Sequence, residues 1–299
     1  MLSEEHSRSA SKQAVATEVD TALLTSWPLP DPDQAADKDD RGSVLLVGGS
    51  NEMPGAILLS AVAAMRAGAG KLCIATAARV SHLVAQAVPE ARVIALPETE
   101  AGGLRLEDAH SLPQQVDAVL VGPGLLDEEA SVALTQKLFR LYPAAKFVLD
   151  TLAMSVVREA IENHEVVVTP HPGEMAHLTN HDKDQIANDL HGTATRAAEK
   201  WRVVVALKSS TTMIAHPDLR VWCHKRGNSG LAISGSGDVL ARIITALCAR
   251  GASIEQATVW GVALHARCGD ELAQRIGPVG FLAREISDVL PGVMKSLSS

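Results

Sequence analysis

Short, continuously apolar runs alternate with longer alanine-rich stretches along most of this chain. The apolar runs are rich in β-branched residues and predict strands, and they read VLLV, LCIA, VIA, AVLV, FVLD, VVVT and VVVAL. The intervening stretches predict helices, starting for example at about Pro54, at Glu128 and at Met154. A strand with no polar face is buried on both sides, which is typical of a mostly parallel sheet covered by helices on both faces.

This rhythm changes toward the C-terminal side. The runs TMIA and VWCH are separated only by residues 216–220, a length that suits a hairpin, so we expect a mixed sheet. Helical stretches at roughly 237–250 and 254–275 follow without a linker. We therefore expect one α/β domain over residues 41–299, preceded by a flexible or loosely packed N-terminal arm over residues 1–40, which is acidic and proline-containing.

Composition narrows the classes of function. With 27 Lys plus Arg against 35 Asp plus Glu, the formal net charge is −8, and aromatic residues make up only 3% of the chain. Both values disfavour nucleic-acid binding, which needs clustered cations and aromatic platforms, and a small solute is the expected partner. The four cysteines form no C-x-x-C pair and predict buried thiols in a reducing compartment. The sequence shows neither a signal-like segment nor an apolar run of membrane length, so we expect a cytoplasmic protein.

Two glycine-rich loops follow predicted strands, where open α/β sheets bind their ligands. Residues 48–56 follow VLLV, and Gly122-Pro123-Gly124 follows AVLV. Neither segment has the G-x-G-x-x-G spacing of dinucleotide-binding folds, and the phosphate-loop pattern is also absent. Taken alone, each loop is equally consistent with a tight turn between a strand and a helix.

The strongest chemical signal is the segment NSGLAISGSGDVL at residues 228–240, which runs directly into an apolar helical pattern. The amides of Gly235, Ser236 and Gly237 can present successive N–H groups at a helix N-terminus, where a phosphoryl group carrying negative charge would bind. Asp238 would then lie in the first helical turn. The alternative is that Asp238 only complements the helix dipole, an interaction of about 0.3–1 kcal/mol.

Two further loops carry polar residues at predicted strand ends. TPHPGE places His171 and Glu174 in a proline-fixed loop, and the alternative interpretation is a rigid turn. The segment after VVVAL offers an ammonium group and several hydroxyls to a nucleotide, or forms a solvated turn, and comprises Lys208, Ser209, Ser210, Thr211 and Thr212. The histidines at positions 164, 171, 177 and 181 lack a convincing third ligand, so we do not expect a zinc site.

Taken in order, these segments resemble the ADP- or ATP-dependent NAD(P)H-hydrate dehydratases. The resemblance covers about residues 40–295, and the motifs that carry it are VLLVGGSNEMPGA, MRAGAGKL, VGPGL, VLD, TPHPGE, LKSSTT and NSGLAISGSGDVLARIITAL. It implies a ribokinase-like three-layer sandwich. It also implies that a nucleotide phosphorylates the ring hydroxyl of hydrated NADH or NADPH, after which phosphate leaves and the reduced cofactor is restored.

The resemblance also implies roles for individual residues. Asp238 accepts the hydroxyl proton while the amides of residues 235–237 stabilise the transferred group. The residues expected to contact the hydrated dinucleotide are Ala56, Gly124, His171 and Asp238. The residues expected to contact ADP or ATP are Lys208, Ser209, Ser210, Thr211, Thr212 and Gly237. Glu174 matches the position that holds Mg²⁺ through water.

This sequence departs from the family pattern at a few positions, notably Leu152 in place of a carboxylate and Ser209 in place of glycine. These departures motivate the alternative of a non-catalytic nucleotide-binding relative, and the shared fold leaves open a kinase of a small alcohol such as a vitamin precursor. Many relatives carry an additional epimerase domain. We expect a stand-alone dehydratase whose epimerase is another chain, and a homo-oligomer formed through an alanine-rich surface helix.

Overall fold

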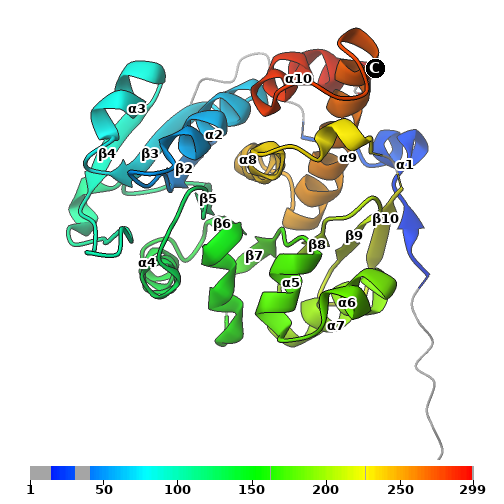
Figure 1. Ribbon diagram of the computed structural model, residues 1–299, viewed down its shortest axis with the longest axis horizontal. Coiled ribbons are helices and arrows are strands. Elements are labelled where there is room, and N and C mark those ends of the chain that lie inside the picture. Colours follow the sequence, from blue (N-terminus) through cyan, green and yellow to red (C-terminus); the bar gives the residue numbers. More distant parts are fainter. Residues whose placement is uncertain (1–14, 31–40, 162, 226, 298–299) are drawn as a thin grey trace, which may run out of the picture.

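One mixed sheet forms the centre of the molecule in the computed structural model, which describes residues 15–30, 41–161, 163–225 and 227–297. The strand order in this sheet is β1-β10-β9-β8-β7-β6-β5-β2-β3-β4 (Figure 1). The strands are β1 (Thr17–Glu18), β2 (Ser43–Val47), β3 (Lys71–Ala77), β4 (Arg92–Leu96), β5 (Ala118–Val121), β6 (Lys146–Leu149), β7 (Glu165–Val168), β8 (Val204–Leu207), β9 (Thr212–Ala215) and β10 (Val221–His224). The strands from β2 to β8 pair in parallel, whereas β9 is antiparallel to both β8 and β10. The predicted mixed sheet and the hairpin are therefore confirmed.

Helices cover both faces of the sheet, as the apolar strands require. They are α1 (Thr21–Ser26), α2 (Pro54–Arg66), α3 (Ser81–Ala87), α4 (Glu128–Leu141), α5 (Pro172–Thr179), α6 (Lys183–Asn188), α7 (Leu190–Trp201), α8 (Ser236–Ala249), α9 (Ile254–Arg275) and α10 (Ala283–Leu297), with short 3₁₀ helices η1 (Ala109–Ser111), η2 (Thr151–Arg158) and η3 (Ser229–Leu231). Figure 1 shows α2, α8, α9 and α10 on one side of the sheet and α4, α5 and α7 on the other. The predicted helix starts at Pro54 and Glu128 are confirmed.

Helix α8 is the most deeply buried of these elements. Twelve of its fourteen residues are buried, and it packs on β2, β5 and β6 while α2 and α9 flank it. A helix that is apolar on almost every side belongs in the interior. The N-terminus of α8 is thereby held rigidly at the edge of the sheet where the parallel strands end.

The strand order reverses between β2 and β5, which lie side by side at the centre of the sheet. The chain proceeds from β2 outward through β3 and β4, and then returns to β5 and continues in the opposite direction. At such a switch point the loops after the two strands diverge, and ligands of open α/β sheets bind in the crevice that results. Here these two loops are the glycine-rich segments after β2 and β5 that the sequence singled out.

Three local expectations differ from the structure. Residues 15–30 of the expected loose arm form β1 and α1, with Val19 and Leu24 buried, and the carbonyl of Trp27 accepts a hydrogen bond from the indole of Trp260. The remainder of that arm lies outside the described residues. The segment after β6 forms the 3₁₀ helix η2 at once, without the α-helix expected from Met154. Helix α10 was not anticipated. All four cysteines are buried, as predicted.

Candidate active site

The carboxylate of Asp238 lies in the first turn of α8, as the sequence predicted. Its side chain is 20% exposed, and its Oδ1 accepts a hydrogen bond from Nη2 of Arg242 at 3.3 Å. Burial is the main reason that the pKa of Asp238 is raised above its ordinary value, and the negative charge of Asp150 adds to this effect, while Arg242 and Lys208 oppose it. A carboxyl with a raised pKa is a stronger base, which suits proton abstraction from a hydroxyl.

The start of α8 presents backbone amides beside this carboxylate. Gly235 precedes the helix with a φ of 87°, a conformation that favours glycine, and this turns the chain into the helix. The amide of Ser236 donates to the carbonyl of Ile233 at 3.3 Å, so it is already engaged in a turn. The amides of Gly237 and Asp238 lie in the first turn, where an α-helix provides no internal acceptor. These amides can receive an anion such as a phosphoryl group.

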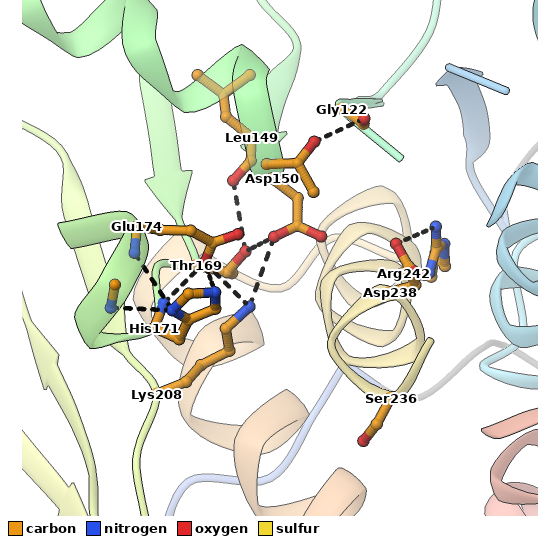
Figure 2. A network of polar contacts seen from close by, with 12 residues as sticks. Gly122, Leu149, Asp150, Thr169, His171, Glu174, Lys208, Ser236, Asp238 and Arg242 are labelled. Carbon is orange, nitrogen blue, oxygen red and sulfur yellow. Dashed lines mark hydrogen bonds and ion pairs between the residues drawn. The ribbon is translucent and has the colours of Figure 1, made fainter. Parts of the chain in front are cut away.

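The side chain of Ser236 points away from the polar cluster (Figure 2). Its hydroxyl and its carbonyl both lie 3.0 Å from Nε2 of His265 on α9. A carbonyl can only accept, so Nε2 carries the proton. Burial lowers the pKa of His265 to about 4, so this imidazole is neutral near pH 7. Ser236 therefore contributes backbone to the site and not its hydroxyl.

Lys208 follows β8 and lies between two carboxylates. Its Nζ is 3.6 Å from Oδ1 of Asp150 and 3.9 Å from Oε2 of Glu174, and Asp150 also accepts a hydrogen bond from the hydroxyl of Thr169 at 2.8 Å (Figure 2). A Cβ added at Gly237 would lie 3.1 Å from Nζ of Lys208, so the ammonium group stands directly beside the first turn of α8. The structure thus places a cation next to the amides that can receive an anion.

His171 caps α5 and is held in one orientation. Its Nδ1 accepts hydrogen bonds from the amides of Gly173 (3.0 Å) and Glu174 (3.2 Å), and Oε2 of Glu174 accepts from the amide of His171 at 2.8 Å. Because Nδ1 accepts, the ring proton of the neutral imidazole is on Nε2. His171 and Glu174 line a hollow of about 300 Å³ together with Leu152, the residue that departs from the family pattern.

Ala56 and Gly124 come together at the switch point between β2 and β5. Gly124 has a φ of 70°, and a Cβ there would lie 2.8 Å from the carbonyl oxygen of Met53 and 3.1 Å from the Cβ of Ala56. The carbonyl of Ala56 accepts a hydrogen bond from Nη2 of Arg242 at 3.1 Å, the same nitrogen that contacts Asp238. Ala56, Gly124 and Asp238 are therefore neighbours across α2, β5 and α8.

The four residues that follow Lys208 lie in the turn between β8 and β9 and at the start of β9. Ser209 and Ser210 are exposed in the turn between β8 and β9, Thr211 is half-buried, and Thr212 is the first residue of β9. Within the described residues, none of these four side chains makes a hydrogen bond or an ion pair with the cluster around Asp238. The structure therefore brings Lys208 to the site, with residues 209–212 as a hairpin turn beyond it.

Three residues of this cluster were not anticipated as site residues. Asp150 was noted only as the end of the VLD run, although a carboxylate directly after a strand buried on both faces is itself a signal. Arg242 could have been found because it is a charge four residues after Asp238 in an otherwise apolar helix. For His265 we find no local signal, since only the packing of α9 brings it to Ser236.

Two features are absent from the described residues. These residues contain no group of three or more His, Cys, Asp or Glu side chains that could hold a metal ion. No helix in the same residues is long and apolar enough to cross a membrane.

The mostly parallel sheet, with a carboxylate and an amide-rich helix start at its strand ends, defines an α/β enzyme of the ribokinase-like type. The family model described as NAD(P)H-hydrate dehydratase matches residues 44–292. The chain therefore belongs to the NAD(P)H-hydrate dehydratase family. The fold, the family and the dehydratase class predicted from the sequence are confirmed.

Individual relatives agree with this assignment. The ADP-dependent (S)-NAD(P)H-hydrate dehydratase of Xanthomonas campestris is 43% identical over 93% of this chain and 96% of its own length. The bifunctional NAD(P)H-hydrate repair enzyme of Moorella thermoacetica is 36% identical over 92% of this chain, which spans only 54% of that longer protein. The crystal structure of the ADP/ATP-dependent NAD(P)H-hydrate dehydratase from Bacillus subtilis, co-crystallised with ATP and Mg²⁺, has a TM-score of 0.84 at 30% identity and covers 94% of this chain and 99% of its own. The expected cofactors, ADP or ATP with Mg²⁺, agree with these names.

Proposed function

We propose that this chain restores NADH and NADPH from their hydrated forms with ADP or ATP as phosphoryl donor. The observation that carries the proposal is the placement of Asp238, a partly buried carboxylate with a raised pKa, in the same helical turn as the amides of Gly237 and Asp238 and beside the ammonium group of Lys208. A base, an anion-binding helix start and a cation are the groups that phosphoryl transfer to a hydroxyl needs.

The chemistry assigned to these groups is as follows. The hydroxyl on the hydrated nicotinamide ring gives its proton to Asp238, and its oxygen forms a bond to the terminal phosphorus of the nucleotide while the bond to the leaving phosphate oxygen breaks. The lone pair of the ring nitrogen then breaks the bond between the ring carbon and the ester oxygen, so that inorganic phosphate leaves and the ring becomes an iminium cation. Loss of a proton from the neighbouring ring carbon to water forms the ring double bond and restores the reduced ring. With ADP the products are the reduced dinucleotide, phosphate and AMP. Hydroxide is a poor leaving group and phosphate is a good one, which is why a nucleotide is needed.

The residues of the site fit a magnesium ion held largely by water and nucleotide. Mg²⁺ prefers oxygen ligands and keeps several waters, and the carboxylates of Asp150 and Glu174 face the same space beside Lys208. The ion would supply positive charge to the phosphates of the nucleotide. Glu174 would act on it through water, while Lys208 neutralises the two carboxylates and keeps them oriented.

The remaining site residues receive roles from their positions. Ala56 and Gly124 form the start of α2 and the loop after β5, at the switch point, and Nε2–H of His171 is a fixed donor beside the hollow lined by Leu152. We assign these three residues to the hydrated dinucleotide. Lys208 and the hairpin turn at 209–212 are assigned to the adenine nucleotide, together with Gly237.

The test uses the purified full chain with hydrated NADH and either ADP or ATP in the presence of Mg²⁺. Recovery of reduced-nicotinamide absorbance with stoichiometric release of phosphate is the expected result. A stable phosphorylated product without recovered absorbance would identify a kinase of an alcohol. Nucleotide binding without any product would identify a non-catalytic relative. Either of these outcomes contradicts the proposal.

The expectations about an epimerase partner, homo-oligomerisation and a cytoplasmic location remain proposals. We propose an NAD(P)H-hydrate epimerase as the functional partner that supplies one epimer of the hydrate, and the name of the Moorella thermoacetica relative, a bifunctional NAD(P)H-hydrate repair enzyme, is consistent with a second activity that accompanies dehydration. With a mixture of both epimers, turnover should stop part-way and resume when an epimerase is added. Homo-oligomerisation is tested by sedimentation of the full chain, and the cytoplasmic location by fractionation of cells.

A further inference from the structure

We infer that Arg242 is a positioning residue of this site, which orients the Asp238 carboxylate and ties it to the first turn of α2. The inference rests on the proposed function and adds to it a residue to which the sequence motifs gave no role.

The burial of Arg242 is costly and needs an explanation. Its side chain is 0% exposed in the middle of the apolar helix α8, and within the described residues neither Nε nor Nη1 has a hydrogen-bond partner. Taking a guanidinium group out of water costs several kcal/mol, and protein groups normally satisfy most of its donors. An aliphatic side chain would fill this place at less cost, so packing alone does not account for an arginine here.

Both hydrogen bonds that Arg242 makes within the described residues lead to the site. Its Nη2 lies 3.3 Å from Oδ1 of Asp238 and 3.1 Å from the carbonyl oxygen of Ala56. That carbonyl also accepts from the hydroxyl of Ser60 at 2.6 Å, so the first turn of α2 is held from two sides. One nitrogen thus joins the catalytic base to the residue assigned to the dinucleotide, on a helix that is otherwise distant in the sequence.

This bridge has two consequences for Asp238. Engaging Oδ1 restricts rotation of the carboxylate and leaves Oδ2 as the oxygen that can receive a proton. The charge of Arg242 also opposes burial and the nearby Asp150, which both raise the pKa of Asp238, and Lys208 acts in the same direction as Arg242. Without Arg242 the carboxylate would hold its proton to higher pH and could not serve as a base until the pH rose further.

The test compares Arg242→Gln and Arg242→Lys with the wild-type chain. Glutamine removes the charge and ends two bonds short of the position of Nη2, whereas lysine keeps the charge but ends one bond short of the nitrogen that contacts both Asp238 and Ala56. A matched control is Thr245→Val, one turn further along α8, where the hydroxyl of Thr245 donates only to the carbonyl of Ala241. The measurements are kcat and KM for dehydration of hydrated NADH from about pH 4 to 9, where carboxylates with raised pKa values titrate, together with thermal unfolding of each variant.

In Arg242→Gln, the acid limb of the pH profile of kcat should move upward by about 1 pH unit or more, as expected on removal of a neighbouring opposite charge. Arg242→Lys should keep the acid limb near its wild-type position and lower kcat more than it raises KM, and Thr245→Val should match the wild type in both readouts. A folded glutamine variant with an unmoved acid limb overturns the inference. So does a lysine variant with wild-type kcat, which keeps the inference testable where the glutamine variant does not fold. Wild-type protein that never dehydrates the hydrate instead refutes the proposed function.

Discussion

Replacement of Asp238 by asparagine isolates the role of the carboxylate, because asparagine has nearly the same shape and removes only the charge and the basicity. The amide oxygen of asparagine can still accept the hydrogen bond that Arg242 donates at 3.3 Å. The backbone amides at the start of α8 are unaffected by the change. We therefore expect Asp238→Asn to fold and to bind nucleotide about as well as the wild type.

The expected loss of activity follows from the role assigned to this group. General-base catalysis contributes typically about 10²–10⁴ in rate, which corresponds to about 3–6 kcal/mol of transition-state stabilisation at roughly 1.4 kcal/mol per tenfold. The raised pKa of Asp238 makes this carboxylate a stronger base than an ordinary aspartate, which is consistent with a general-base role. The loss should appear in kcat, while KM for the nucleotide changes little.

The assay follows recovery of reduced-nicotinamide absorbance from hydrated NADH at saturating nucleotide, with nucleotide binding measured in parallel by the shift in thermal unfolding temperature. In wild-type protein, activity should fall as the pH is lowered through the raised pKa of Asp238, because the carboxyl must be ionised to act as a base. A kcat within about tenfold of wild type for Asp238→Asn, well below the general-base range, would refute the assignment. Equal losses in nucleotide binding and in turnover would refute it as well.

Three further predictions test other parts of the site. Gly122→Ala should lower the free energy of unfolding by at least about 3 kcal/mol in urea titrations. Gly122 has a φ of 138°, and a Cβ there would lie 1.9 Å from the carbonyl oxygen of Asp150. The control is Gly292→Ala in α10, where a Cβ meets nothing within 4 Å, and this change should leave the free energy of unfolding nearly unchanged or raise it. Burial lowers the pKa of His265 from 6.5 in the unfolded chain to about 4 in the folded protein. The stability that depends on a neutral His265 is therefore present above about pH 6.5 and is lost as the pH falls toward 4. Between these two pH values the free energy of unfolding should drop by about 2–3 kcal/mol more in the wild type than in His265→Gln. Lys208→Met should raise KM for the nucleotide by about tenfold or more in steady-state kinetics, and an unchanged KM would remove Lys208 from the nucleotide site.

Periodicity predicted most of the elements because each depends on nearby residues. The helix starting at Pro54 has proline in its first turn, and the helix starting at Glu128 has Asp127 as its N-cap. Nearby residues therefore determine where both helices start. The segment after β6 was misjudged because Thr151 takes a φ of 50° and donates to the carbonyl of Gly122, a contact between positions 29 residues apart. The strand and helix in residues 15–30 exist for a similar reason, since they pack on residues more than 200 positions later.

The residues of the site also differ in whether nearby sequence or long-range contacts determine their place. Asp238 and the glycines before it form one continuous motif, Lys208 directly follows the strand β8, and His171 lies three residues after the end of β7, so the sequence alone could propose them. The ion pair of Lys208 with Asp150 and the bridge from Arg242 to Ala56 join separate elements through the sheet and across α2 and α8. No spacing rule relates such positions, and only the folded arrangement shows that they share one cluster.

The outer edge of the sheet has a consequence for how the chain is made. Strand β1 pairs with β10, so Thr17 and Glu18 meet Trp222 and Cys223, about 200 residues further along. During translation β1 leaves the ribosome long before β10 has been synthesised, so β1 remains unpaired through most of synthesis. The pairing of β1 with β10 can form only when translation is nearly complete. In nascent chains halted before β10, a protease should therefore cleave at Thr17 and Glu18 as readily as in an unfolded peptide.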